Sequence, residues 1–168
     1  YKKNGHDVVV VVSAPAGMTD NLVKNACEIS KNPNKRELDM LLTTGEQISA
    51  ALLSMAVNEL GESAISFNAF QINFKTTLDH TKAQILNIDT EKIKEKLSLG
   101  KVVVITGFQG VNENFDITTL GRGGSDTTAV ALGAALKADE VEIYTDVDGV
   151  YTADPRVVDN PKKLNEIS

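Results

Sequence analysis

The chain has 168 residues, of which 42% are hydrophobic and 24% charged, which is enough apolar material for one ordinary domain. Lys and Arg number 17 against 23 for Asp and Glu, so the net charge of −6 provides no basic footprint for a nucleic-acid backbone. The longest aliphatic run, residues 8–12, is far shorter than the ~20 residues of a membrane span, and no secretory signal pattern is visible. We expect a cytoplasmic location, without nucleic-acid or membrane partners.

The single cysteine limits the redox and metal chemistry of the chain. Cys27 has no second cysteine with which to form an intramolecular disulfide or a thiolate zinc cluster. Apolar residues surround it at helical spacing: Leu22, Val23, Ala26 and Ile29. We therefore predict that Cys27 is buried packing rather than a nucleophile.

The chain opens with a predicted strand at residues 7–13, DVVVVVS. A β-branched run without alternation is typical of a strand buried on both faces of a parallel sheet. Thr19 and Asp20 are good N-cap residues, so we predict a helix from about Asn21. The polar, proline-containing residues 32–38 then lead into a further helical stretch.

The next predicted helix covers residues 43–60 and is followed by Gly61, a plausible C-terminal stop. Its apolar stripe, which we expect to pack on a sheet, consists of Ile48, Leu52, Met55 and Leu60. Residues 63–67 suit a strand. Residues 68–89 mix strand-like and loop-like signals, and no element is predicted there.

The second half repeats the alternation of helix and strand. Thr90 caps a short predicted helix with Ile93 and Leu97 inward, and residues 101–108 form a second apolar strand. A third strand is predicted at residues 141–147. The order β-α-α-β-α-β-α-β indicates an α/β fold, doubly wound, with a mainly parallel sheet.

Glycine-rich or acidic motifs follow the strands predicted at residues 7–13, 101–108 and 141–147, and these motifs cover residues 13–20, 107–110, 119–126 and 145–156. The carboxyl ends of parallel strands meet at one edge of the sheet, where such folds bind ligands. The sequence therefore predicts one ligand site built from these four motifs.

The motif TLGRGGSD, residues 119–126, is the most informative of them. Gly121, Gly123 and Gly124 allow backbone amides to approach a ligand, and together with the following helix N-terminus they form an anion-binding concavity. Arg122 supplies a planar fork for a carboxylate or phosphate. The alternative is a plain glycine turn with a serine–aspartate cap. Neither a Walker A sequence nor G-x-G-x-x-G is present.

Acidic residues elsewhere allow two interpretations each. Glu46 in TTGEQ either interacts with the helix dipole or receives a substrate ammonium. Asp146 and Asp148 suit a surface β-turn, and the EF-hand register of a metal site is absent. His6 and His80 have no partner at metal-ligand spacing and are predicted to be solvated.

These residues together suit phosphoryl transfer. The predicted site has glycine amides and arginines for anions and carboxylates for an ammonium or Mg²⁺, and it has no activated Ser/His or Cys/His nucleophile. Positioning and charge neutralisation supply most of the catalysis in that reaction.

The motifs VVVSAPAGMTD, LLTTGEQISAALL, GRGGSDTTAVALG and TDVDGVYTADPR resemble those of the aspartate kinases, a branch of the amino acid kinase family. The resemblance implies a three-layer α/β/α sandwich and transfer of the γ-phosphoryl of MgATP to the β-carboxylate of L-aspartate, in lysine, threonine and methionine biosynthesis. It also implies a homo-oligomer.

The resemblance also implies roles for particular residues. Glu46 is expected to bind the α-ammonium of aspartate and Arg122 its α-carboxylate, with Asp126 as the catalytic aspartate. Further aspartate contacts are implied at Thr19, Gly123, Gly124 and Ser125. ATP contacts are implied at Thr145, Asp146, Tyr151 and Arg156.

The chain also departs from the family pattern. The family's Lys-Phe-Gly-Gly opening, a later ATP-contacting lysine and tandem regulatory ACT domains are not found in residues 1–168. We expect a truncated catalytic domain, feebly active at best by itself. A glutamate or acetylglutamate kinase, or a non-catalytic ligand-binding module, remains the alternative.

Overall fold

The computed structural model describes residues 1–145, 152, 158 and 160–162. The helices are η1 (Lys2–Asn4), α1 (Met18–Ile29), α2 (Lys35–Leu42), α3 (Thr44–Glu59), α4 (Glu91–Ser98) and α5 (Gly124–Leu136). The strands are β1 (Val9–Val12), β2 (Ala64–Phe67), β3 (Phe74–Thr76), β4 (Ile85–Ile88), β5 (Val102–Thr106), β6 (Gln109–Val111) and β7 (Ile117–Thr119). The α/β class is confirmed, and β1, β2 and β5 lie where three of the four strands were predicted.

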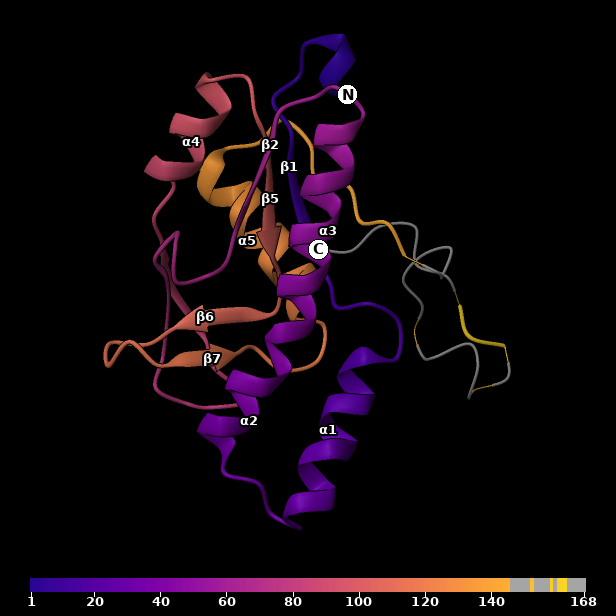
Figure 1. Cartoon of the computed structure of the whole chain (residues 1–168), viewed down its shortest axis with the longest axis vertical. Helices are drawn as coiled ribbons and strands as arrows, with labels where there is room; N and C mark the ends of the chain where they lie inside the picture. Colours follow the sequence, from indigo (N-terminus) through magenta and orange to yellow (C-terminus); the bar gives the residue numbers. More distant parts are fainter. Residues whose placement is uncertain (146–151, 153–157, 159, 163–168) are drawn as a thin grey trace.

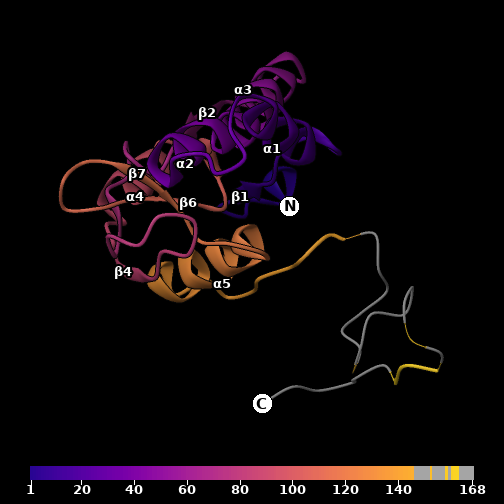
Figure 2. The same cartoon turned by 90° about the horizontal axis from the view of Figure 1, so that it is seen from below.

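A three-stranded parallel sheet forms the centre, in the order β1-β5-β2. Val103 of β5 lies level with Val9 of β1 and with Ile65 of β2. Figure 2 shows α1, α2 and α3 on one side of this sheet and α5 on the other, which is a three-layer α/β/α arrangement.

Alternate side chains of the central strands supply two cores, one on each face of the sheet. Val103 and Ile105 are fully buried in a cluster with Ile93 of α4 and Leu132 of α5. Val102 and Val104 pack with Ala50 of α3 and its neighbours. Burial on both faces explains why β5 has no polar alternation, as the sequence predicts.

A second sheet has the order β4-β3-β6-β7, and two of its strands, β3 and β4, lie in residues 68–89, where the sequence predicted no element. Within the described residues, its parallel pair is β3 with β6, through Lys75 and Val111. β6 and β7 lie at the end of the central sheet toward which β5 runs (Figure 1). The strands of this sheet are short: Phe74–Thr76 and Gln109–Val111, for example, span three residues each. A strand of this length shows too few alternations of polar and apolar residues to be recognised in the sequence.

The predicted apolar stripe of α3 is wrong. Leu52, Met55 and Leu60 are 59%, 66% and 80% exposed, and Ile48 is exposed as well. The opposite face, with Ala50, packs on the central sheet. Leu53 and Val57 pack on the same side as Ala50, so apolar residues occupy both faces of α3.

Three other expectations are also corrected. Helix α1 begins at Met18 after Gly17 in a left-handed conformation, so Thr19 lies inside the first turn and does not cap the helix. Cys27 is exposed, because α1 buries only Ala26. Residues 141–145, the described part of the third predicted strand, lie in no helix or strand, and Val141 instead packs against Gly133 of α5.

Helices α2 and α3 adjoin at Thr43, and the combined stretch Lys35–Glu59 is long and apolar enough to cross a membrane by length and composition alone. It carries two buried acidic side chains, Asp39 and Glu46, and its α3 part packs on the central sheet. These features are those of a core helix in a folded domain.

Candidate functional site

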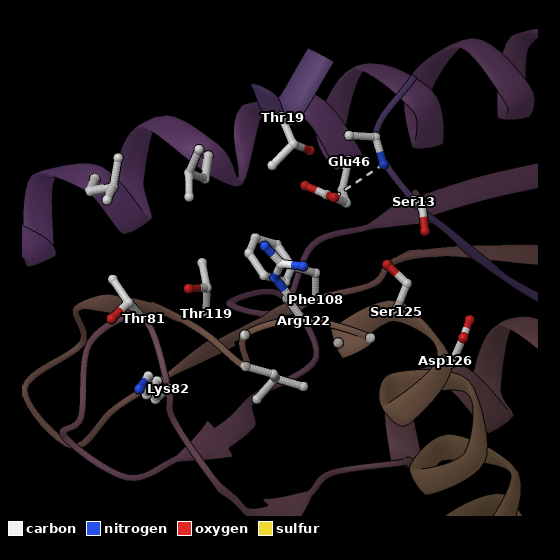
Figure 3. Close-up of a pocket in the computed structure, with 17 residues that line it drawn as sticks. Ser13, Thr19, Glu46, Thr81, Lys82, Phe108, Thr119, Arg122, Ser125 and Asp126 are labelled. Carbon is white, nitrogen blue, oxygen red and sulfur yellow. Dashed lines mark hydrogen bonds between the residues drawn. The ribbon is translucent and has the colours of Figure 1, made fainter. Parts of the chain in front are cut away.

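A pocket of about 970 Å³ opens where β1 and β5 end. Its wall includes Ser13 after β1, Phe108 after β5 and the glycine-rich loop between β7 and α5. The predicted aspartate-site residues all line it: Thr19, Glu46, Arg122, Gly123, Gly124, Ser125 and Asp126 (Figure 3). Residues far apart in the sequence therefore meet at one site, as the strand-end argument requires.

The glycine-rich loop needs glycine for two separate reasons. Gly123 precedes α5 with φ 72°, a left-handed conformation that side chains disfavour. Gly124 is buried, and a Cβ there would lie 2.8 Å from the Phe108 ring. Next to it, a Cβ on Gly107 would lie 2.8 Å from the Ser125 side chain. The N-terminus of α5 thus sits directly against the end of β5.

Glu46 is a buried carboxylate with an unused oxygen. Its side chain, in the first turn of α3, is only 3% exposed, and its Oε1 accepts a hydrogen bond from the Ala14 amide at 3.1 Å. Its Oε2 has no hydrogen-bond partner among the described residues. Burial raises the pKa of the Glu46 carboxyl above its ordinary value. An incoming cation would pair this oxygen.

Arg122 lies across the pocket from Glu46. Figure 3 shows its guanidinium in the centre of the pocket, directed toward the side that carries Glu46. The Arg122 side chain is exposed and takes part in none of the ion pairs of the described residues. A buried anion and an available cation therefore face a shared space.

Asp126 lies in the first turn of α5, at the same end of the pocket as Ser125 (Figure 3). It is exposed and lies near the positive end of the α5 helix dipole. Asp126 and Glu46 are the acidic side chains among the described residues that line the pocket. Among the described residues no group of three or more His, Cys, Asp and Glu side chains is placed to hold a metal.

Several lining residues were missed by sequence reasoning. Thr81 and Lys82 come from residues 68–89, where no element was predicted, and Thr119 comes from β7. Lys82 adds a second cationic side chain to the wall. Thr81 and Lys82 lie in the turn between β3 and β4 and carry no periodic or motif signal, whereas Thr119 begins the TLGRGGSD motif but was given no role of its own.

His80 is not a solvated residue as predicted. Its Nδ1 lies 2.8 Å from Oδ2 of Asp39, and its side chain is 19% exposed. Asp39, which the sequence did not single out, is completely buried.

The predicted ATP contacts lie apart from this pocket or outside the description. Thr145 is described but does not line the pocket. Asp146, Tyr151 and Arg156 lie outside the described residues. The same holds for Asp148.

The fold and the pocket define an α/β/α domain with a cavity at the carboxyl ends of its central strands, lined by both acidic and basic side chains. The model of the amino acid kinase family matches residues 1–168, and the chain belongs to that family. Among curated relatives, it is 60% identical to the aspartokinase of Bacillus sp. strain MGA3, over 99% of this chain and 41% of the relative.

Solved structures agree with the sequence comparison. Aspartate kinase from Synechocystis is 51% identical, with a TM-score of 0.74 over 95% of this chain and 26% of that one. Aspartokinase III of E. coli in complex with aspartate and ADP is 26% identical, with a TM-score of 0.78 over 94% of this chain and 46% of that one. The chain thus spans less than half the length of these proteins.

Proposed function

We propose that the protein is an aspartate kinase, which transfers the γ-phosphoryl group of MgATP to the β-carboxylate of L-aspartate. The observation that carries this proposal is the buried, unpaired Oε2 of Glu46 facing the available guanidinium of Arg122 across one pocket. An α-amino acid carries the matching pair of charges, an ammonium and a carboxylate, on a single carbon. The 60% identity to an aspartokinase supports this choice of substrate.

In this proposal Glu46 binds the α-ammonium and Arg122 the α-carboxylate of aspartate. An ammonium would pair the Glu46 oxygen that burial has deprived of water, so binding offsets a desolvation penalty already present in the fold. The planar guanidinium suits a bidentate carboxylate. Gly123, Gly124 and Ser125 complete the pocket on the side of α5.

The β-carboxylate of aspartate is already an anion at neutral pH, so the reaction needs no general base. The barrier is repulsion between two anions, and amides and cations aimed at the transferring group reduce it. The N-terminus of α5 and the side chains of Arg122 and Lys82 line the pocket and can supply this charge. Asp126 is the proposed catalytic aspartate that organises the groups around the phosphoryl.

Nucleotide and metal binding are part of the same proposal. The related E. coli enzyme was solved with ADP, which supports ATP as the donor here. Thr145, Asp146, Tyr151 and Arg156 are its proposed contacts. Mg²⁺ binds through one or two carboxylates plus phosphates, and Asp126 in the pocket wall fits that need. Bound Mg²⁺ would neutralise phosphate charge. Cytoplasmic location and self-association stay predictions.

The first prediction concerns the two charges that define the pocket. Arg122→Ala and Glu46→Gln should each weaken L-aspartate binding at least about tenfold, since each loses a charge-assisted contact of about 1.5–3 kcal/mol. Isothermal titration of aspartate, then MgATP, into each variant measures this. Arg36→Ala is the matched control, because Arg36 pairs with Asp116 on the surface and does not line the pocket.

Aspartate binding that disappears in both pocket variants and persists in the Arg36→Ala control would support the proposal. Unchanged aspartate affinity in both pocket variants would refute it. Glutamate or acetylglutamate binding more tightly than aspartate to the unaltered protein would instead assign a sister specificity within the family.

A further inference from the structure

Asp39 is a fully buried carboxylate beneath the pocket that the proposed mechanism does not use. It is 0% exposed, and its two oxygens have three hydrogen-bond partners. Its Oδ1 accepts from the hydroxyl of Thr119 at 2.7 Å. Its Oδ2 accepts from the amide of Thr81 at 3.0 Å and lies 2.8 Å from His80 Nδ1. The buried Asp39 carboxylate holds these three partners in place, because the loss of any one of them would leave a buried polar oxygen with fewer hydrogen bonds, at a cost in free energy.

These hydrogen bonds join α2, which adjoins the helix that carries Glu46, to the opposite wall of the pocket. Asp39, Thr43 and Glu46 are all buried and follow one another at spacings of four and three residues, so they share one face of the adjoining α2 and α3 helices. The Thr43 amide donates to the Asp39 carbonyl at 3.2 Å. The Thr43 carbonyl in turn accepts from the Gln109 side chain at 3.3 Å.

The partners of Asp39 lead to Arg122 by two routes. Along the chain, Thr119 ends β7 three residues before Arg122. Through space, Thr81 is held in a left-handed conformation with φ 70°, and its carbonyl oxygen lies 3.4 Å from the Cβ position of Gly121. Figure 3 shows Thr81 and Thr119 together on the wall beside Arg122.

We propose that Asp39 is a positioning residue that sets the separation between the carboxylate of Glu46 and the guanidinium of Arg122, and thereby the affinity of the pocket for an α-amino acid. The inference rests on the proposed function. Asp39 does not line the pocket and touches no substrate. It acts through Thr81 and Thr119, each of which it connects to α2.

The informative substitution is Asp39→Asn, which keeps the size of the side chain. The amide NH₂ would either face the Thr81 amide, a donor against a donor, or, with the amide turned over, face Thr119 and leave the Thr119 hydroxyl hydrogen without its acceptor. In either orientation, one of the two connections from residue 39 to the wall beside Arg122 would be weakened. The affinity for the amino acid should therefore fall, whereas the affinity for MgATP should change little.

The experiment compares steady-state kinetics of the full-length protein and its variants. Asp39→Asn should raise KM for L-aspartate about tenfold, equivalent to one tenfold step in affinity, with KM for MgATP changed less than about twofold. The preference for aspartate over succinate, which lacks the ammonium, should fall. A merely destabilising substitution would move neither the ratio of the two KM values nor this preference.

Thr118→Val is the matched control. Thr118 neighbours Thr119 on β7 and is equally buried, but its hydroxyl bonds Thr76 at 2.6 Å, away from the pocket. Thr119→Val and Thr119→Ser provide a second test if the Asp39 variant does not fold. Valine removes the hydroxyl that donates to Asp39 and should raise KM for aspartate, whereas serine restores the hydroxyl and should leave KM near the unaltered value.

The inference is supported if Asp39→Asn and Thr119→Val raise KM for aspartate selectively while Thr118→Val and Thr119→Ser do not. It is overturned if the Asp39 variant keeps its aspartate KM, or if Thr118→Val changes the kinetics to the same extent. The Glu46→Gln variant distinguishes failure of this inference from failure of the proposed function. If that variant loses aspartate and the Asp39 variant does not, only the inference fails; if neither loses it, the proposed function fails as well.

Discussion

At the scale of single residues, the site combines local motifs with long-range contacts. Gly45 shows how both act on one carboxylate. A Cβ at Gly45 would lie 2.7 Å from the Ala14 side chain, so only glycine lets the start of α3 meet the β1–α1 loop. That contact brings the Ala14 amide within 3.1 Å of Glu46. The glycine in TTGEQ is therefore a packing requirement as well as a helix start.

The raised pKa of Glu46 makes the stability of the unliganded protein pH-dependent. Its folded pKa lies above the ordinary value of 4.5 because burial disfavours the charge. The contribution of Glu46 to the free energy of unfolding is therefore fully present below pH 4.5, where the carboxyl is neutral, and it is lost as pH rises through the folded pKa. Glu46→Gln removes this titration.

Urea unfolding at a series of pH values checks this prediction. The free energy of unfolding of the unaltered protein should fall relative to that of Glu46→Gln as pH rises from 4 to about 7. Saturating aspartate should reduce the difference by pairing the carboxylate. A difference that stays constant across this range would contradict the expectation.

At the scale of elements, α3 shows the limit of pattern reasoning. Both helix faces carry apolar residues, so spacing alone does not identify the buried one. Leu52 is 59% exposed, while its neighbour Leu53 packs with the cluster of Val102 and Val104. The helix boundaries and the Gly61 stop were predicted correctly, with φ 87° at that glycine. They depend on local geometry, and the choice of face does not.

The two neighbouring leucines allow a matched comparison. Leu53→Ala should lower the free energy of unfolding by about 2 kcal/mol, because it removes methyl groups from a packed cluster. Leu52→Ala should change it by less than about 0.5 kcal/mol, as expected for an exposed site. Denaturant unfolding of both variants decides between the faces. A larger loss for Leu52→Ala would mean that the outer face of α3 is covered.

At the scale of the whole molecule, the second sheet joins segments that are far apart in the chain. Strand β3 pairs with β6 across more than thirty residues of sequence, through Lys75 and Val111. Gly110 lies in that contact. A Cβ there would lie only 2.2 Å from Cγ2 of Thr76 and 3.2 Å from the Phe74 carbonyl. The sheet that supports the pocket wall therefore requires glycine at position 110, where there is no room for a side chain.

Gly110→Ala should lower the free energy of unfolding by about 1–3 kcal/mol through overpacking. Thr76→Ser removes the clashing methyl and keeps the hydroxyl that bonds Thr118. The double variant should recover part of the loss, giving a coupling of opposite sign to the single effects. Thermal or urea unfolding of the four proteins measures the cycle. Simple additivity of the two substitutions would show that this contact does not limit the pairing.

The sequence by itself determined the α/β class, the strands at β1, β2 and β5, and a glycine-rich motif that places Arg122 and Asp126 at the start of a helix, because these follow from short-range patterns and chain direction. Tertiary structure decided the buried face of α3, the exposure of Cys27, the second sheet and the Asp39–His80 contact. Each of these depends on partners distant in the chain, and the free energy of burying a group is set by what it meets there.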